Sequence, residues 1–280
     1  MHVMKIDAHH HFWAYNEEEF PWINQQMSEL QRDFFPKELD GLLKTQGFDG
    51  SVVVQARQSM EETRWLLEQA EKYDYIKGVV GWVDLCSQDV TEQLNQFTKS
   101  PFLKGIRHVI HDEPDDLFML REDFQRGVSL LSDYGLTYDL LLFPKHIPYA
   151  LELVKKFPNQ QFVLDHIGKP DIKNKILSPW QEDLKELAAH KNVYVKLSGM
   201  VTEADWRNWT KEDFKPYLDV VFQAFDPTRM MIGSDWPVCT VSDSYQSVLG
   251  IVIDYVEQFA PRYKDPILGE NCARFYSLKE

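Results

Sequence analysis

Eight short runs of apolar and β-branched residues recur about every 25 to 45 residues along this 280-residue chain, and their number limits the folds open to it. Segments with helical signals separate the runs, as in repeated parallel βα units. Eight such units in a chain of this length predict one α/β domain over residues 1–280, a (β/α)8 barrel of the TIM type, regular or distorted. The predicted strands are "VMKID" (3–7), "SVVVQ" (51–55), "IKGVVGWV" (76–83), "LKGIRHV" (103–109), "LTYDLLLF" (136–143), "QFVLDHIG" (161–168), "NVYVKLSG" (192–199) and "MMIGSDW" (230–236).

Helix signals lie between the runs. Ser59 stands three residues before Glu62, and Ser178 precedes Pro179, so both serines are predicted to cap helices. The long first connection, residues 12–36, is predicted to be an irregular loop or flap over the C-terminal face of the barrel. An amphipathic helix is predicted from the apolar stripe of Tyr245, Val248, Leu249, Val252, Val256 and Phe259.

Polar side chains gather where the predicted strands end. The active sites of TIM-type barrels lie at the C-terminal ends of the strands, so these side chains are expected to converge on one rim. In chain order they are His9, His10 and His11; Gln55 and Arg57; Trp82 and Asp84; Arg107 and His108, with His111 just beyond; Asp165 and His166; Lys196 and Ser198; and Asp235.

The histidine triplet in "KIDAHHHFW" is interpreted as part of a strand end, not as a purification tag. Residues two apart in a strand point to the same side, so His9 and His11 are predicted to face the barrel mouth and His10 the wall. Two imidazoles on one face can hold a divalent metal ion or together polarise a carbonyl group. The pattern leaves both options open.

Asp235, in "GSDWP", follows the last predicted strand. Closure of the barrel brings that strand beside the first one, so Asp235 is expected near His9 and His11 as a general base or metal ligand. His166 follows the sixth strand and is predicted to be a ligand or a group that polarises a carbonyl.

Several rim residues are candidates for binding substrate. Arg107 is expected to pair with a carboxylate, either from the protein or from the substrate. Lys169 is expected to hold substrate oxygens, and tryptophans near the rim can stack on a sugar face or simply pack. The predicted substrate-binding residues are Arg107, His108, Lys169, Trp236 and Trp82, while the roles of His108, His111 and His146 stay open.

Charge and cysteine content narrow the function further. A net charge of −14 with a pI near 5.1 argues against nucleic acid or an anionic membrane as a partner, because both need a positive surface. Three cysteines without close pairing (Cys86, Cys239 and Cys272) fit a reducing compartment, so a cytoplasmic protein is expected. No GxGxxG, P-loop or GxSxG motif is present. The sequence leaves the oligomeric state open, a homo-oligomer included.

With "IDAHHHFW", "FVLDHIGKP", "VKLSGMVTEADW" and "IGSDWPV" in this order, the chain resembles the amidohydrolase superfamily (amidohydrolase family 2). It is more similar to the branch of sugar and pyrone lactonases that includes fuconolactonase, rhamnonolactonase and 2-pyrone-4,6-dicarboxylate lactonase. The resemblance covers almost the whole chain. It matches His9 and His11 to the family's first-strand histidines, His166 to its sixth-strand histidine and Asp235 to its eighth-strand aspartate.

The resemblance implies a hydrolase that opens a sugar lactone, such as L-fuconolactone or L-rhamnonolactone, to the aldonic acid. Asp235 would activate water, and His9, His11 and His166 would stabilise the oxyanion. The chain departs from the binuclear metal members of the superfamily, because its fourth strand ends in Arg107 and His108. No cofactor is required by this scheme, although one divalent ion such as zinc could bind His9, His11, His166 and Asp235. A metal-dependent decarboxylase and a catalytically silent binding protein are the alternatives.

Overall fold

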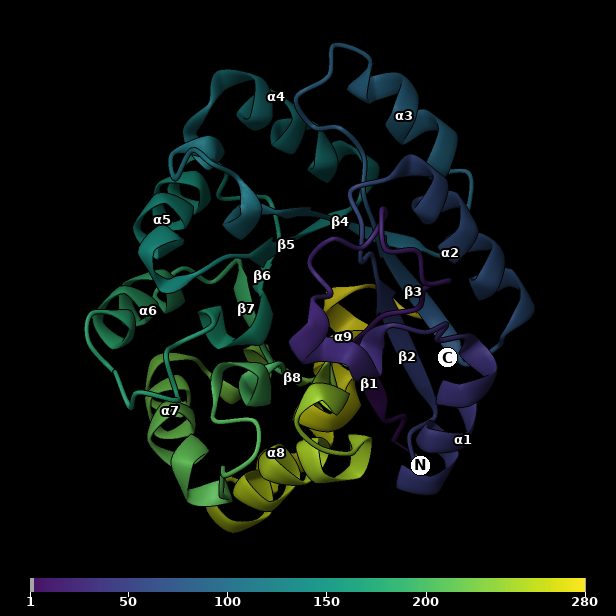
Figure 1. Ribbon diagram of the computed structural model, residues 1–280. Helices are drawn as coiled ribbons and strands as arrows, with labels where there is room; N and C mark the ends of the chain where they lie inside the picture. The colour runs from purple at the N-terminus through teal and green to yellow at the C-terminus, as the bar shows by residue number, and fades with distance from the viewer. Residues whose placement is uncertain (1–2, 280) are drawn as a thin grey trace.

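The computed structural model describes residues 3–279, which form one barrel of eight parallel strands with helices packed around it (Figure 1). The strands neighbour one another in chain order, which confirms the predicted (β/α)8 fold. They are β1 (Ile6–His10), β2 (Gly50–Val54), β3 (Ile76–Gly81), β4 (Leu103–Val109), β5 (Thr137–Leu141), β6 (Phe162–Leu164), β7 (Val193–Leu197) and β8 (Met230–Ile232).

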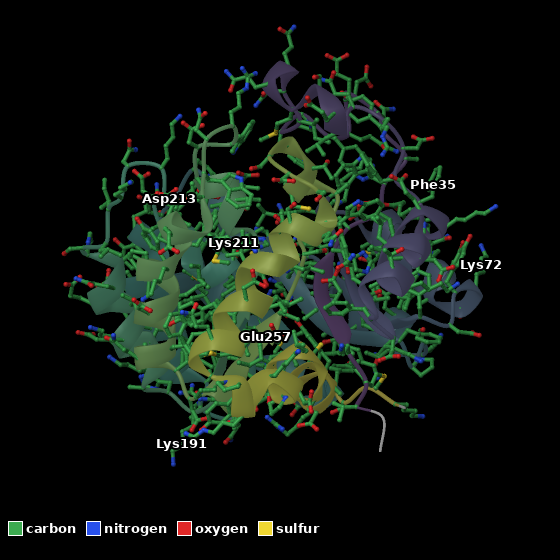
Figure 2. The ribbon with its side chains drawn as sticks, turned by 90° about the horizontal axis from the view of Figure 1, so that it is seen from below. Phe35, Lys72, Lys191, Lys211, Asp213 and Glu257 are labelled. Atoms are coloured by element: carbon green, nitrogen blue, oxygen red, sulfur yellow. The ribbon has the colours of Figure 1, made fainter. Side chains whose placement is uncertain are left out.

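The helices cover the outside of the barrel, apart from α9, which lies near its axis in Figure 1. Charged side chains such as Lys72 on α2, Glu257 on α8 and Lys191 in the turn after α6 are exposed at the surface (Figure 2). The α-helices are α1 (Pro36–Gln46), α2 (Met60–Lys72), α3 (Val90–Phe97), α4 (Glu122–Leu131), α5 (Ile147–Lys156), α6 (Trp180–Ala188), α7 (Lys211–Ala224), α8 (Tyr245–Phe259) and α9 (Asn271–Phe275).

The helix predictions are confirmed in part. Ser59 caps α2 by accepting a hydrogen bond from the backbone N–H of Glu62. The predicted cap at Ser178 is wrong, because Pro179 occupies the cap position of α6 and provides no side-chain acceptor. In α8 the predicted stripe is buried except for Phe259, which ends the helix and is 48% exposed.

Three strand predictions are wrong by three or more residues at an end, and those for β2, β3, β5 and β7 differ from the structure by one or two residues. β1 starts and ends later than predicted, so His9 and His10 are strand residues and only His11 follows it. β6 and β8 stop after three residues each. The backbone at His166 (φ 55°) and Asp235 (φ 58°) is left-handed and cannot continue an extended strand.

The barrel closes between its first and last strands through a short seam. Asp235 donates its backbone N–H to the carbonyl of His9 (2.8 Å), and His11 donates its own to the carbonyl of Trp236 (2.7 Å). His10 and Trp236 form an isolated parallel bridge between these bonds. The seam therefore lies beside the histidine triplet itself.

The barrel interior is layered. Its lower part is apolar, and α9 closes it from the N-terminal end of the strands with Cys272 and Phe275, together with Tyr276 directly after the helix. Above this plug lie buried charged side chains of the middle strands, and above these lie the histidines. The apolar side chains of the lower layer are Ile6, Ala8, Val52, Val54, Val80, Val163 and Met231.

The connection after β1 crosses in front of the barrel, in agreement with the predicted flap (Figure 1). It contains a short 3-10 helix, η1 (Gln25–Leu30), and contributes Trp22 and Met27 to the wall of a cavity at the barrel mouth. An ion pair of 2.6 Å between Arg57 and Glu19 attaches the flap to the loop after β2. Within residues 3–279, no helix is both long enough and apolar enough to span a bilayer.

Candidate active site

A cavity of about 310 Å³ opens at the C-terminal ends of the strands. That volume lies at the lower end of the range for small-molecule sites, roughly 300–1,000 Å³. One wall is apolar and includes Trp22, Phe143 and Trp206. The polar lining contains five of the predicted site residues: His11, Arg107, His166, Lys169 and Asp235.

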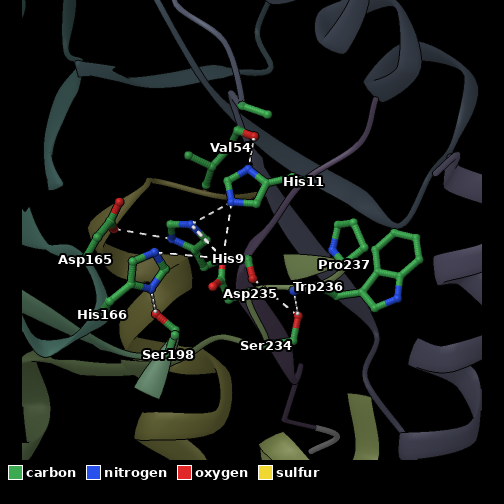
Figure 3. A network of polar contacts seen from close by, with 12 residues as sticks. His9, His11, Val54, Asp165, His166, Ser198, Ser234, Asp235, Trp236 and Pro237 are labelled. Carbon is green, nitrogen blue, oxygen red and sulfur yellow. Dashed lines mark hydrogen bonds and ion pairs between the residues drawn. The ribbon is translucent and has the colours of Figure 1, made fainter. Parts of the chain in front are cut away.

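Three imidazoles converge on one oxygen atom of Asp235 at the floor of this cavity (Figure 3). Oδ1 of Asp235 lies 3.3 Å from Nε2 of His11 and 3.8 Å from Nε2 of both His9 and His166. The Nε2 atoms of His9 and His11 are 3.2 Å apart. All four side chains are at most 5% exposed, so the imidazoles and the carboxylate contact one another away from bulk water.

Two of the three imidazoles, those of His11 and His166, are fixed by hydrogen bonds on the side away from Asp235. Nδ1 of His11 donates to the carbonyl of Val54 (2.8 Å), which leaves the Nε2 lone pair facing the cavity whenever the ring is neutral. Nδ1 of His166 forms a 2.9 Å hydrogen bond with the hydroxyl of Ser198. Gly199 then passes so close to His166 that a Cβ at this position would lie 2.3 Å from the ring nitrogen. Backbone and side chains together therefore fix the ring orientations.

Asp235 is positioned by a buried support on the outer side of the seam. Asp7 accepts hydrogen bonds from the backbone N–H (2.9 Å) and hydroxyl (2.6 Å) of Ser234 and from the hydroxyl of Tyr245 (3.1 Å). The Ser234 hydroxyl oxygen in turn accepts from the N–H of Trp236 (3.0 Å). These bonds fix the residues on both sides of Asp235, whose left-handed backbone is otherwise costly.

His10 lies apart from this group, as predicted. It is fully buried on the outer side of β1, where its Nε2 forms a 2.9 Å hydrogen bond with the hydroxyl of Ser51. A bulge in the pairing of β1 with β2 between Asp7 and His10 sets this alternation.

Beneath the histidines lies a closed layer of four buried charges. Lys196 pairs with Asp139 (2.6 Å) and Asp165 (3.1 Å), and Arg107 pairs with Asp165 (3.0 Å). Arg107 thus has a protein carboxylate as its partner and also lines the cavity. Although burial opposes it, Asp139 and Asp165 raise the pKa of Lys196, so its ammonium stays charged.

The environment keeps two of the three site histidines neutral. Burial, reinforced by the charge of Lys196, holds the pKa of His9 well below its usual range. Burial, reinforced by His9, does the same for the pKa of His166. Neutral imidazoles can offer a lone pair to a metal ion or an N–H to a substrate oxygen.

The donor set fits one divalent metal ion. Zinc accepts histidine nitrogen and carboxylate oxygen at ~2.1 Å, and four ligands placed tetrahedrally at that distance stand ~3.4 Å from one another. The separations of 3.2, 3.3 and 3.8 Å among His9, His11 and Asp235 are close to this value. A second metal ion would need a ligand from β4, but β4 has Arg107 there, which cannot bind a metal ion.

The rim of the cavity carries an ion pair and an aromatic stack. Lys169 contacts the carboxylate of Glu203 directly, and both line the cavity. The ring of His111 stacks on Phe143 at 4.7 Å between centroids, and its Nδ1 has no hydrogen-bond partner among the described residues. Burial lowers the pKa of His111 to about 3, so this ring is neutral at ordinary pH.

The structure places four other sequence candidates away from the cavity. His108 stacks on Phe118 and forms hydrogen bonds with Glu113 (2.6 Å) and the indole N–H of Trp82 (3.3 Å). Trp236 is buried against Phe12 and Phe34 behind the seam. His146 is also buried and bonds to Asp116 (3.2 Å). Neither Trp82, His108, Trp236 nor His146 lines the cavity.

Several residues of the site carry no predicted role from the sequence. The sequence places Asp165 and Lys196 at strand ends but assigns them no role. Their position at strand ends is the signal that could have linked them to His9. Glu203 carries no such signal, because it reaches Lys169 from the 3-10 turn η7 (Met200–Glu203) after β7. Met27 and Trp22 come from the flap, where no periodic pattern points inward.

Known proteins resemble this chain along its full length. The amidohydrolase family profile matches residues 6–278. An L-fucono-1,5-lactonase of Burkholderia multivorans is 38% identical over 291 residues, which cover 100% of this chain and 98% of that protein. A crystal structure of an amidohydrolase from Burkholderia multivorans with bound zinc is 37% identical, covers 99% of this chain and 100% of that one, and superposes with a TM-score of 0.96.

More distant structures share the fold alone. The 2,6-dihydroxybenzoate decarboxylase from Rhizobium aligns over 99% of both chains with a TM-score of 0.68, at 13% identity. The family match spans all eight strands and the loops that carry His9, His11, His166 and Asp235. The chain belongs to the amidohydrolase family.

Proposed function

We propose that this protein is a lactonase that hydrolyses the internal ester of a sugar lactone, an aldonolactone such as L-fuconolactone or L-rhamnonolactone, to the open aldonic acid. One observation carries the proposal: the carboxylate of Asp235 meets three imidazoles at the floor of a cavity that suits one small molecule. The likeness to an L-fucono-1,5-lactonase over the whole chain supports this substrate class.

The first step is attack of water on the ring carbonyl carbon. Asp235 takes the proton from the attacking water, since its carboxylate is the anionic group at the cavity floor next to the imidazoles. The carbonyl oxygen becomes an oxyanion as the tetrahedral intermediate forms. His166 faces it from the cavity wall, where Nε2–H can donate to this oxygen while Nδ1 accepts from the hydroxyl of Ser198, and it stabilises the negative charge. Nε2 of His11 carries a lone pair toward the cavity, so the neutral ring of His11 does not donate to the oxyanion as the sequence suggested.

The second step opens the ring. The bond between the carbonyl carbon and the ring oxygen breaks, and the ring oxygen takes the proton that Asp235 received from water. The product is a hydroxy acid with the same atoms as lactone plus water. One carboxyl group thus serves as base and then as acid. Lys169 and Glu203 orient the sugar hydroxyls from the rim, and Arg107 does so from deeper in the cavity lining.

A zinc ion bound by His9, His11, His166 and Asp235 would supply Lewis-acid polarisation of the lactone carbonyl. The metal-bound amidohydrolase of Burkholderia multivorans supports this as an option for the fold. A lactone is a strained ester and more reactive than an amide, so the proposed reaction uses only side chains of the protein and requires no cofactor.

The cytoplasm is the compartment that fits the free thiols best. Cys86, Cys239 and Cys272 are unpaired, and the two fully buried ones have no exposed sulfur to oxidise.

A hydrolysis screen tests the proposal. A panel of aldonolactones is incubated with the enzyme, and release of acid is followed with a pH indicator, with and without a chelator. We expect turnover of at least one six-carbon lactone in both series. Failure to open any lactone, together with chelator-sensitive release of CO₂ from an aromatic or unsaturated acid, would instead establish the decarboxylase alternative.

A further inference from the structure

The lysine and the arginine that line the cavity are each paired with a carboxylate of the protein. Lys169 contacts the carboxylate of Glu203 directly at the rim, where the two side chains are 13% and 19% exposed. Arg107 pairs with Asp165 at 3.0 Å. Within residues 3–279, no other lysine or arginine lines this cavity. A ligand that enters it therefore meets neither a lysine nor an arginine whose charge is unpaired.

The guanidinium of Arg107 has few protons left for a ligand. Nη1 donates to Asp165 and lies 3.3 Å from Nε2 of His9, and Nη2 donates to the backbone and side-chain oxygens of Gln55. Of its three nitrogens, only Nε has no hydrogen-bond partner in the described part of the chain. An arginine holds a carboxylate best with two adjacent N–H groups, and here no such pair is available. One N–H suffices for a single uncharged oxygen.

The cavity lining has more carboxylates than lysine and arginine side chains. The carboxylates are those of Asp112, Glu203 and Asp235. Burial lowers the pKa of His111 to about 3, so its ring adds no positive charge. A carboxylate on a ligand would lie near these anions without a cation of its own, and an unpaired charge held away from water is costly. An uncharged ligand avoids this cost.

We propose that Glu203 is a specificity-determining residue: by pairing with Lys169 it limits the site to uncharged lactones and excludes lactones that carry a free carboxylate. Specificity of this kind comes from an unpaired charge in the wrong complex as well as from contacts in the right one. The inference rests on the lactonase reaction proposed above and adds which sugar lactones the site accepts. Hexonolactones are accepted, whereas hexarolactones, in which C6 is a carboxylate, are not.

Selectivity between two matched lactones is the first test. The pair consists of the hexonolactone opened fastest in the screen and the hexarolactone with the same ring, in which a carboxylate replaces the group at C6. In the wild type, kcat/KM for the uncharged lactone should exceed that for the charged one by at least about tenfold, and Glu203→Gln should lower this ratio by about tenfold, because it frees the ammonium of Lys169 for the carboxylate. Equal kcat/KM values for the two lactones in the wild type overturn the proposal.

Two further variants separate the ion pair from the general charge of the cavity. Asp112→Asn is the matched control, because it also removes a carboxylate from the lining, but one that is 64% exposed and pairs with His111. It should change the ratio little, since exposed charges interact weakly. Glu203→Gln combined with Lys169→Met should restore the wild-type preference, because the freed cation is then absent. A shift in Asp112→Asn as large as that in Glu203→Gln contradicts the proposal.

Binding of ligands that are not lactones is the second test, and it does not depend on the reaction. Protein freed of metal with a chelator that is then dialysed away is titrated calorimetrically with D-glucarate, a dianion, and with sorbitol, its uncharged counterpart. Glu203→Gln should bind glucarate at least about tenfold more tightly than the wild type does, with an affinity that falls as salt is added, and sorbitol should show no such gain.

The two tests distinguish the two proposals. If no lactone is opened but Glu203→Gln gains affinity for glucarate, the reaction is wrong and the selection against charge stands. If lactones are opened and glucarate binds equally to the wild type and Glu203→Gln, the role given to Glu203 is wrong.

Discussion

Oδ1 of Asp235, three residues beyond the last strand, lies 3.3 Å from Nε2 of His11, one residue beyond the first strand. The two side chains come from opposite ends of the chain and meet only because β8 closes onto β1. Their separation is that of a direct polar contact, with no room for a water molecule between them. The carboxylate of Asp235 and the imidazole of His11 are therefore in direct contact at the cavity floor.

Replacement of Asp235 by Asn should abolish most turnover of the lactone substrate while the thermal unfolding midpoint changes little. The amide cannot accept the proton of water, and general-base catalysis typically contributes about 10²–10⁴-fold. Asp112→Asn is the control, because this carboxylate also lines the cavity but is 64% exposed and pairs with His111. If the Asp235→Asn enzyme keeps more than about a tenth of the wild-type kcat, Asp235 is excluded as the base.

Lys169→Met should weaken binding of the sugar lactone more than it slows chemistry. The charged Nζ lies at the rim beside Glu203, and a hydrogen bond to a charged group is worth about 1.5–3 kcal/mol, so KM should rise by about tenfold or more. Lys145→Met, which removes a lysine paired with Asp116 outside the cavity, serves for comparison. A fall in kcat at unchanged KM would speak against a binding role.

Acid should destabilise the fold below about pH 6.5. Burial lowers the pKa of six histidines, so the unfolded chain binds protons that the folded chain excludes, and the stability present above the unfolded value of about 6.5 is lost as pH falls below it. They are His9, His10, His108, His111, His146 and His166.

Buried carboxyls oppose this trend. Burial raises the pKa of Asp7 and Asp139 to about 6 and that of Glu62 to about 7, so their folded forms hold protons more tightly and gain stability as pH falls through these values. The affected histidines outnumber these carboxyl groups, so we expect the free energy of unfolding to fall overall as the pH falls. Urea unfolding at pH 7.5 and 5.5 measures it, and His10→Gln should reduce the drop by about 1.4 kcal/mol. An identical drop in both proteins would refute the assignment to His10.

Gly233→Ala should disrupt the seam. A Cβ at this position would lie 2.8 Å from Cβ of His9 and 3.1 Å from Cβ of Ser198, so the strands must separate or His9 must move. Overpacking of this kind costs typically about 1–3 kcal/mol, and we expect a lower Tm together with lower kcat. Gly41→Ala is the matched control, since a Cβ there meets nothing within 4 Å inside α1 and should raise Tm slightly. Unchanged kcat in Gly233→Ala would mean that the seam tolerates the extra carbon.

The number and order of the strands can be predicted because each strand has its own apolar pattern. Both ends of β4 are predicted correctly, since "LKGIRHV" pairs along its whole length with its neighbours. The predicted β6 and β8 are too long, because the left-handed backbone at His166 and Asp235 leaves no mark in residue type. Glycine or asparagine would have marked these turns, but the site needs an imidazole and a carboxylate there.

The candidate site can be predicted where strand geometry alone decides side-chain direction. His9, His11, His166 and Asp235 come together as expected. Trp82 and His108 are less predictable, because their direction depends on partners such as Glu113 and Phe118 from a later loop. The buried charge layer cannot be predicted for the same reason, because Lys196 on β7 meets Asp139 on β5 and Asp165 after β6 only once the barrel has formed.

The seam between β1 and β8 also sets when activity can appear during synthesis. The histidines of β1 are made before the proposed base and the plug helix α9, which follow them at residues 235 and 271–275. A nascent or truncated chain that lacks residues beyond 230 has imidazoles but no carboxylate to work with them. Hydrolysis of a lactone would therefore report that synthesis has passed Asp235 and that β8 has closed onto β1.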